Sequence, residues 1–443
     1  MQKDGFNSRI GALMAFVGSA VGLGNLWKFP YMAGKNGGAA FILIYVGFMF
    51  CLCLPLMLSE CVIGRRAREG AFDSFRKLAP RSGWSIIGVI SVITAVLILS
   101  FYSVVGGWTV RYIVASFRAA FTGDGYGSAF GAFASSNFEP LLYHLIFLAL
   151  TITVLWSGVR NGIERYSKIL MPVLFLMVLF LAAYSITLPG AGKGIEFLLR
   201  PDFSSITSSV VLDALGQGLF SLSLGMAIMI TYGSYLSNSE NLPRMVVATI
   251  SMDLIFALLA GFAILPAVFA FGFDPAEGAG LLFVILPEVF ARVPAGAIIG
   301  PAFFVVIFIA AITSAVSLFE VIVAAVIRSV KLSRKKILLC IGAFLALSGT
   351  LCSVSLGLLS EFRIFGLNIF DLFDTLSSTY MMPAGAFLIS LFVGYRMKRA
   401  DVFDELSNGK TIKIRMFGLF MLLVKYFVPA GIVLIFLNKL GVF

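Results

Sequence analysis

The sequence predicts an all-α integral membrane protein with about eleven transmembrane helices. Of its 443 residues 60% are hydrophobic and only 12% are Asp, Glu, Lys or Arg, against roughly 25% in an ordinary soluble domain. The mean hydropathy is +1.00. The apolar residues also gather in runs of about 20 residues, the length of a helix that crosses a bilayer. Lipid is therefore the expected solvent for much of the surface.

The apolar runs extend along the whole sequence, so residues 1–443 are predicted to form one transmembrane domain, without a soluble domain. They lie near 10–33, 38–64, 85–118, 141–157, 164–187, 212–239, 244–272, 297–328, 335–353, 370–396 and 416–440. The stretch Gly278–Val293 is apolar but short and contains Pro287, so we expect a hairpin or re-entrant loop. Residues 119–139 are rich in Gly, Ser and Asn, which predicts an irregular surface loop.

The basic residues lie in alternate loops between the apolar runs. Four clusters account for most of them: Arg65, Arg66, Arg68, Arg76, Lys77 and Arg81; Arg160, Arg165 and Lys168; Arg328, Lys331, Arg334, Lys335 and Lys336; Arg396, Lys398, Arg399, Lys410, Lys413 and Arg415. Loops rich in Lys and Arg stay in the cytoplasm. We therefore expect a multi-pass protein of the cell inner (plasma) membrane, with its N-terminus cytoplasmic and its C-terminus outside. The net charge of +11 then needs no nucleic-acid partner.

Cysteine and histidine indicate neither a disulfide framework nor a metal centre. The five cysteines lie in or beside apolar runs, where we expect small buried hydrophobic side chains; they are Cys51, Cys53, Cys61, Cys340 and Cys352. The single histidine, His144, opens an apolar run and is expected to be solvated or interfacial. One histidine cannot build a metal site.

Small residues interrupt the first and sixth apolar runs. They are Gly18, Gly22 and Gly24 in the first run, and Ser221, Ser223 and Gly225 in the sixth. A glycine in a helix interior costs about 1 kcal/mol relative to alanine, so such groups favour a break, although close helix packing is the alternative. Breaks in the first and sixth spans are typical of two inverted five-helix repeats. The repeats are expected at about 10–187 and 212–396, with an extra helix at about 416–440.

The first run carries the string GSAVGLGNLWKFPYMAGKNGGAAF, which begins at Gly18. This string resembles the first-helix signature of the neurotransmitter:sodium symporters, the family of the bacterial leucine transporter. The resemblance extends from about Arg9 to Leu440 and is strongest in spans 1, 2, 3, 6 and 8. It implies the leucine-transporter fold, with helices 1 and 6 broken, and sodium-coupled uptake of amino acids through the lipid bilayer.

The resemblance implies two Na⁺ sites. Ala20, Asn25, Ser221 and Asp253 match the first site, and Gly18, Val21, Ala310, Thr313 and Ser314 match the second. Both sets offer the oxygen ligands that hard cations prefer. The family usually has Asn at the position of Asp253. A carboxylate there adds the negative charge that animal relatives recruit as chloride, which predicts chloride independence. A structural carboxylate near the membrane face is the alternative for Asp253, and packing through small residues is the alternative for the second set.

The resemblance also implies the contacts of an amino-acid substrate. Its carboxylate would meet the backbone of Leu23 and Gly24 and the hydroxyl of Tyr102, and its amino group would meet Ala20, Phe220, Ser221 and Ser223. Its side chain would lie among Ile98, Phe220, Met226, Ser314 and Leu318. Amine-transporting relatives have Asp where this chain has Gly22, so the substrate is expected to bring its own carboxylate. Met226 favours a large hydrophobic or aromatic side chain, although Met226 as core filler is equally compatible with the sequence.

The remaining matches concern gates and buried acids. Lys28, Gln217, Asp374 and Phe220 match the outer gate, where the family usually has Arg in place of Lys28. At the inner gate an acid of the family is replaced by Arg328, and the partner of Arg9 stays open. Gly162 and Pro172 match a pair that lets span 5 unwind. Glu60 matches an acid that anchors the broken helices, and Glu320 is expected to be structural, a proton shared between the two acids being the alternative.

The predicted cycle is alternating access with two Na⁺ and one amino acid. The alternatives are a proton-coupled transporter of the same fold, a sodium-dependent transporter of amines or other organic solutes, and a channel or sodium-gated receptor. We expect no enzyme, because the spans contain no Ser/His/Asp set, zinc motif or phosphate loop. The sequence leaves the exact substrate and the oligomeric state open.

Overall fold

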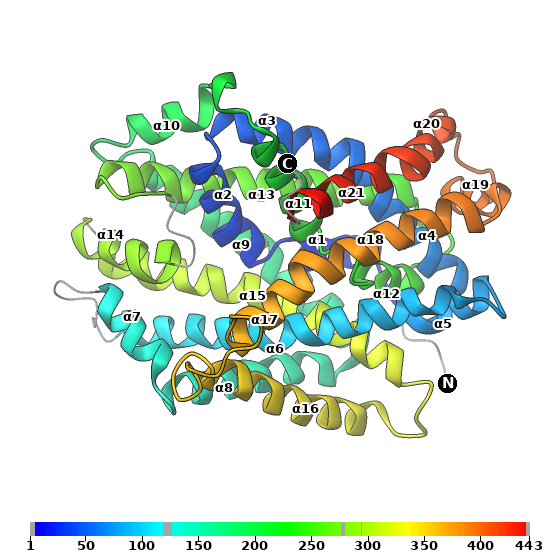
Figure 1. The fold of residues 1–443 in the computed structure, drawn as a ribbon, viewed down its shortest axis with the longest axis horizontal. Coiled ribbons are helices and arrows are strands. Elements are labelled where there is room, and N and C mark those ends of the chain that lie inside the picture. Colours follow the sequence, from blue (N-terminus) through cyan, green and yellow to red (C-terminus); the bar gives the residue numbers. More distant parts are fainter. Residues whose placement is uncertain (1–4, 118–125, 276–279, 294, 440–443) are drawn as a thin grey trace.

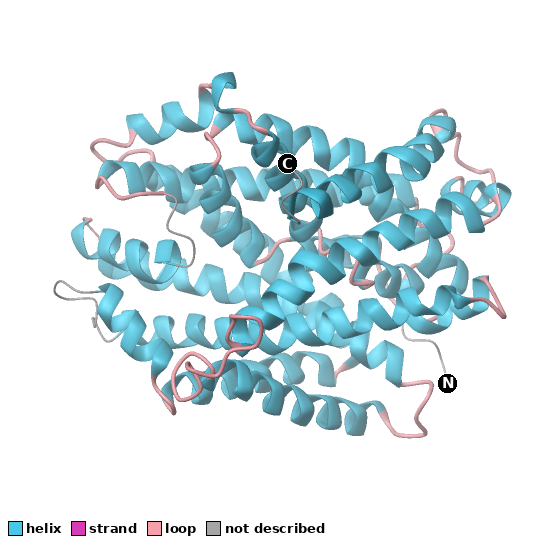
Figure 2. Cartoon of the chain, in the orientation of Figure 1, coloured by secondary structure: helices cyan, strands magenta, loops and turns pink. Residues whose placement is uncertain are grey.

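The computed structural model describes residues 5–117, 126–275, 280–293 and 295–439 (Figure 1). Helices make up almost all the regular structure of these ranges (Figure 2). Nine helical segments among the described residues are long and apolar enough to cross a membrane: Ala39–Ala67, Gly83–Phe117, Glu139–Trp156, Val159–Ser185, Leu242–Ala270, Gly296–Val326, Arg334–Val354, Ile369–Arg396 and Phe417–Asn438. These are the predicted spans 2 to 5 and 7 to 11.

Several of these segments combine α-helices with a π-helical turn. In order along the chain the α-helices are α3 (Ala39–Phe48), α4 (Leu54–Ala67), α6 (Ile86–Phe117), α8 (Glu139–Trp156), α9 (Arg165–Ser185), α13 (Leu242–Ala270), α15 (Gly296–Val326), α16 (Arg334–Val354), α17 (Ile369–Asp374), α18 (Met382–Leu391), α20 (Phe417–Leu422) and α21 (Val428–Lys439). Turns of π-helix join α3 to α4 and precede α9, at Met49–Cys53 and Val159–Glu164.

The first span is broken, as predicted. It consists of α1 (Arg9–Ala20) and a second half formed by a π-helical turn (Gly24–Lys28) and α2 (Phe29–Lys35), and the two halves bend by 49° at the break. In a continuous helix the Gly22 N–H would bond to the Gly18 carbonyl, but here it donates to Asn25 Oδ1 at 3.1 Å. The break therefore leaves backbone oxygens at the end of α1 without their helical partners.

The sixth span is also broken, into α11 (Ser208–Ser221) and α12 (Ile228–Tyr235). The linker between them has positive φ at Ser223 (54°), Gly225 (86°) and Ala227 (61°). A helix cannot continue through three left-handed residues. Each half is too short to cross a bilayer alone, so the two halves together form the predicted sixth span. The alternative of an unbroken glycine-lined packing face is therefore wrong for both spans.

Short helices lie at both ends of the bundle, in the connections between the spans. Figure 1 shows α5 (Ala71–Leu78) and α19 (Arg399–Leu406) at one end, which we call the basic end, and α7 (Tyr126–Ser135), α10 (Gly192–Leu199) and α14 (Leu286–Arg292) at the other. This alternation is the one that eleven successive crossings produce. The predicted irregular loop at 119–139 is wrong for its described part, because α7 packs Phe130 against Trp108, with ring centroids 5.3 Å apart.

The outer helices turn apolar side chains outward, where lipid replaces water. Leu176 and Leu347 are 67% and 71% exposed. The prediction of buried cysteines holds for Cys53, Cys61 and Cys352 and is wrong for Cys51 and Cys340, which lie on such outward faces.

The position of His144 also differs from the prediction. The histidine is fully buried because glycines on two neighbouring helices make room for it. A Cβ at Gly107 would lie 2.6 Å from the His144 backbone nitrogen, and one at Gly349 would lie 2.3 Å from its ring. The predicted solvated or interfacial position is therefore wrong.

Candidate functional site

The two breaks meet α6 and α15 around a cavity in the middle of the bundle. All eleven residues predicted to contact the substrate line it, together with Gly22: Ala20, Leu23, Gly24, Ile98, Tyr102, Phe220, Ser221, Ser223, Met226, Ser314 and Leu318. The space for water-sized molecules is about 30 Å³, while one water needs about 10–15 Å³. The cavity in this conformation therefore holds only a few water molecules, and lining side chains would have to move before an amino acid could enter.

Glycine backbone and a tyrosine hydroxyl form one end of this cavity. The Leu23 N–H points at Tyr102 Oη, 3.5 Å away. A Cβ at Gly22 would lie 2.4 Å from Ser314 Oγ and 3.4 Å from Tyr102 Oη, and a Cβ at Gly24 would lie 3.1 Å from the Phe220 ring. Only glycine keeps this end open. Backbone N–H groups at a helix start, next to a hydroxyl, are suited to a carboxylate.

Ser223 shapes the opposite wall of the cavity. Its φ of 54° belongs to the left-handed region, and its hydroxyl donates to the Ser19 carbonyl at 3.0 Å. The linker of the sixth span is thereby tied to α1, close to the apolar side chains of Met226 and Leu318. The cavity thus has polar groups at the broken backbone, and apolar side chains from α6, α15 and the linker of the sixth span.

A buried polar cluster lies beside the cavity. Asn25 Nδ2 is 2.8 Å from Asp253 Oδ1 and 3.1 Å from Ser221 Oγ, and Ser221 Oγ is 2.9 Å from Asp253 Oδ2. All three residues are buried, so Asp253 lies in the interior and not at a membrane face. Among the described residues no group of three or more His, Cys, Asp or Glu is placed to hold a metal. The cluster instead offers an amide, a hydroxyl and one carboxylate, a set suited to a hard cation of low charge.

A second set of oxygens faces the first helix from α15. The Cβ position of Gly18 on α1 is 3.5 Å from Thr313 Cβ. Thr313 Oγ1 donates to the Ile309 carbonyl at 3.0 Å and lies 3.1 Å from the Ala310 carbonyl. Asn25 N–H bonds to the Gly22 carbonyl, so the Val21 carbonyl also leaves the helical pattern. The structure therefore brings α1 and α15 together where the sequence predicts the second Na⁺ site.

An aromatic and a basic side chain cover one side of the cavity. Lys28 Nζ lies 3.9 Å from the centroid of the Phe220 ring, and Gln217 Nε2 donates to the Gly24 carbonyl at 3.0 Å. Asp374, at the end of α17, accepts from the Ser378 hydroxyl at 2.8 Å. Three of the four predicted outer-gate residues, Lys28, Gln217 and Phe220, thus lie together around the first break.

The two buried acids have separate partners. Glu60 Oε1 accepts from the Gly225 N–H at 2.7 Å, and Ser91 Oγ donates to the Gly225 carbonyl at 3.1 Å, so α4 and α6 together satisfy the backbone of the sixth-span linker. Glu320 accepts from Tyr235 at 2.6 Å and from Arg334 at 2.5 and 3.0 Å. Both acids therefore have structural hydrogen bonds. The sequence offered no signal for Ser91, because serine is common in membrane helices.

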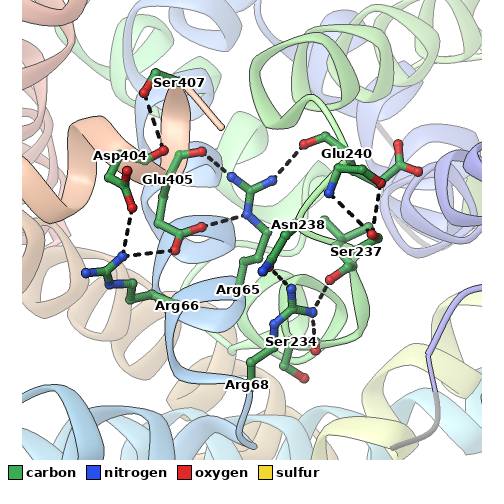
Figure 3. Close-up of polar contacts among 12 residues, drawn as sticks. Arg65, Arg66, Arg68, Ser234, Ser237, Asn238, Glu240, Asp404, Glu405 and Ser407 are labelled. Carbon is green, nitrogen blue, oxygen red and sulfur yellow. Dashed lines mark hydrogen bonds and ion pairs between the residues drawn. The ribbon is translucent and has the colours of Figure 1, made fainter. Parts of the chain in front are cut away.

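Charged side chains tie the basic end together (Figure 3). Arg65, whose side chain is 1% exposed, donates to Glu405 Oε2 and to the Glu240 carbonyl, each at 2.7 Å. The end of α4 is thereby joined to α19 and to the loop that precedes α13. Glu240 Oε1 lies 3.5 Å from Arg9 at the start of α1. Arg9 thus has its partner in this loop, and Arg328 pairs with Glu69.

Glu164 is a residue of this end that sequence reasoning missed. Its carboxylate accepts from the Asn7 N–H at 2.6 Å, from the Ser8 hydroxyl at 2.9 Å and from Lys168 at 2.7 Å. Ser8 in turn caps α1 by accepting from the Gly11 N–H at 3.1 Å. The start of α1 is therefore fastened to the π-helical turn before α9. A single acid among basic residues was the only signal in the sequence.

The comparisons with known proteins agree with this architecture. A model of the Sodium:neurotransmitter symporter family matches residues 3–127 and 135–443. The sodium-dependent transporter YhdH of Bacillus subtilis is 43% identical over 438 residues, which cover 98% of this chain and 97% of that protein. The bovine sodium-dependent dopamine transporter is 28% identical over 378 residues, 72% of this chain and 53% of that protein. The crystal structure of MhsT in complex with L-phenylalanine has a TM-score of 0.91 and 42% identity, covering 98% of this chain and 99% of that one. The chain therefore belongs to the sodium:neurotransmitter symporter family and is a sodium-coupled membrane transporter, not an enzyme.

Proposed function

We propose that this protein imports large hydrophobic or aromatic amino acids together with two Na⁺ ions, independently of chloride. The observation that carries the proposal is the cavity itself, which has broken backbone and Tyr102 at one end and apolar side chains at the other. A hydrophobic amino acid likewise has charged groups at one end and an apolar side chain at the other. The similar MhsT structure contains L-phenylalanine, which supports an aromatic substrate.

In this proposal the substrate carboxylate lies against the N–H groups of Leu23 and Gly24 and the Tyr102 hydroxyl. The amino group faces the Ala20 carbonyl and the end of α11, and the side chain displaces Met226. Gly22 leaves no acid beside the substrate, which favours an amino acid over an amine. The amine alternative would need a carboxylate here, and none lines the cavity among the described residues.

The first Na⁺ would bind at Asn25, Ser221 and Asp253 with the Ala20 carbonyl, and the second between α1 and α15. Because Asp253 is buried beside Asn25, its ionised form supplies a negative charge within the first site. This charge is our reason to propose chloride independence. The second ion would join the Gly18 and Val21 carbonyls to Thr313, and its departure would release α1 from α15.

Two ions supply adequate energy for uptake. Each charge is worth about 2.3 kcal/mol per 100 mV, and a tenfold Na⁺ gradient adds about 1.4 kcal/mol per ion. Together they provide roughly 7 kcal/mol, or an accumulation of about 10⁵-fold when coupling is tight. We propose that the basic end faces the cytoplasm of the inner (plasma) membrane, because it carries the Lys- and Arg-rich loops. The outer gate at Phe220 and the contacts that hold the start of α1 at the basic end would then open in turn.

The test is uptake of radiolabelled tryptophan, tyrosine and leucine into proteoliposomes. An inward Na⁺ gradient is compared with a K⁺ control, and chloride is replaced by gluconate. Accumulation that needs Na⁺ but not chloride supports the proposal. Equal uptake without Na⁺ refutes the two sodium sites and favours a proton-coupled transporter. Conductance without accumulation would indicate a channel.

Two single substitutions test the roles proposed for Asp253 and Thr313 separately. Asp253→Asn restores the residue usual in the family, so uptake should become chloride-dependent. Thr313→Ala removes one ligand of the second site and should raise the Na⁺ concentration needed for half-maximal uptake by about tenfold. Chloride-independent uptake by Asp253→Asn would contradict the role given to this carboxylate.

A further inference from the structure

A cleft opens at the basic end, away from the central cavity. It has a volume of about 540 Å³ and lies between the start of α1, the first turns of α13 and the segment that follows α19. None of the residues of the central cavity lines it. The transport cycle proposed above assigns it no role.

The two sides of the cleft differ in polarity. Ile10 and Leu13 of α1 face Met245 and Ala248 of α13 and form an apolar side. Ile10 is 69% exposed, and its position in the first turn of a membrane span places it at the lipid boundary. Residues three or four apart share one face of a helix, so Ile10 with Leu13 on α1 and Met245 with Ala248 on α13 form the apolar lining of the cleft.

The rest of the cleft is polar and carries two basic residues and one acid. Arg9, Arg244 and Glu240 all line it. The Arg9 side chain is 75% exposed and its ion pair with Glu240 is long, at 3.5 Å. The Arg244 side chain is exposed and makes no ion pair among the described residues. Asn408 and Thr411 complete this side and flank Lys410, which is also exposed.

The cleft thus combines apolar side chains in the first turns of two membrane spans with guanidinium groups at the height expected for the membrane surface. We propose that it binds one anionic phospholipid, with the phosphate between Arg9 and Arg244 and an acyl chain along Ile10, Leu13 and Met245. Guanidinium groups bind phosphate oxygens by paired, charge-assisted hydrogen bonds. A zwitterionic lipid would bring an ammonium group toward the same arginines, so charge favours a lipid with net negative charge.

The bound lipid would act on the start of the first span. Its phosphate competes with Glu240 for Arg9, and this ion pair joins α1 to the loop before α13. The Glu164 contacts to Asn7 and Ser8 stay intact. Lipid binding would therefore loosen one attachment of α1 at the basic end while the contacts of Glu164 remain.

Native mass spectrometry of the full-length protein tests the proposal. The protein in mild detergent is mixed with dioleoyl phosphatidylglycerol or dioleoyl phosphatidylcholine, and the fraction carrying one lipid is measured. We expect phosphatidylglycerol to be retained about tenfold more than phosphatidylcholine. Arg244→Gln should lower this retention severalfold. The matched control is Arg165→Gln, which removes the same charge from an exposed residue of α9 outside the cleft, and retention should not change.

Three results would overturn the proposal. Equal retention of the two lipids would show that the cleft does not select for charge. An equal loss in Arg244→Gln and Arg165→Gln would show attraction by the surface as a whole. Displacement of the lipid by millimolar inorganic phosphate would identify a site for a soluble phosphate instead. Thermal unfolding of both variants, expected to match that of the parent, confirms that the comparison is made on folded protein.

Discussion

Replacement of Glu164 by Gln should weaken the hold of the π-helical turn Val159–Glu164 on the start of α1. The carboxylate accepts from the Asn7 N–H, the Ser8 hydroxyl and Lys168, and hydrogen bonds to a charged group contribute about 1.5–3 kcal/mol each. An amide keeps the shape but loses one acceptor oxygen. Lys168 is 37% exposed, so its ion pair adds at most about 1 kcal/mol. We therefore expect α1 to open about 10 to 100 times more often.

Hydrogen–deuterium exchange of the peptide that covers residues 9–20 measures this opening. Exchange from a locally opened state follows its population, so the rate should rise by the same factor. The matched control is Glu196→Gln, because Glu196 pairs with Arg200 at the same spacing and the same 2.7 Å, but the two side chains are 60% and 80% exposed. That variant should leave the exchange of this peptide unchanged. Unchanged exchange in Glu164→Gln as well would refute the reasoning.

Three further substitutions have expected results. Gly22→Ala places a Cβ 2.4 Å from Ser314 Oγ. It should reduce amino-acid uptake by at least about tenfold with little change in the melting temperature. Normal uptake would contradict the geometry of the cavity. Arg65→Ala removes the hydrogen bonds of a side chain that is 1% exposed and leaves Glu405 with only its longer contact to Arg66, at 3.5 Å. It should cost about 1.5–3 kcal/mol, measured as a lower melting temperature. The control Arg66→Ala, at a side chain 32% exposed, should cost less than about 1 kcal/mol. Gly225→Ala places a Cβ 2.1 Å from a backbone oxygen, at a residue whose φ is 86°. This backbone conformation alone costs about 1–3 kcal/mol for a residue other than glycine. Size-exclusion chromatography should therefore show little folded protein, and a normal folded peak would contradict the predicted strain.

The predicted spans and both breaks are present in the structure, because each depends on local chemistry. Runs of about 20 apolar residues in lipid are expected to be helical, because the backbone must satisfy its own hydrogen bonds there. Groups of small residues with low helix propensity indicate where such a helix breaks. The predictions that failed concern single side chains and one loop. His144, Cys51 and Cys340 are buried or exposed according to the neighbouring helix, and α7 is held in place by Phe130, which packs against Trp108. None of these neighbours is adjacent in sequence.

Hydropathy and backbone preference along the chain are enough to predict that the protein lies in a membrane, where its spans are and which of them are broken. The sequence also named the residues that meet at the cavity, but only through resemblance to a family. Tertiary structure alone decided which groups satisfy the broken backbone and how the ends of the spans are held. Glu60 reaches Gly225 across 165 positions, and Glu164 reaches Asn7 across 157. A polar group in lipid must find such a partner, and only the packing of the helices determines which one lies within reach.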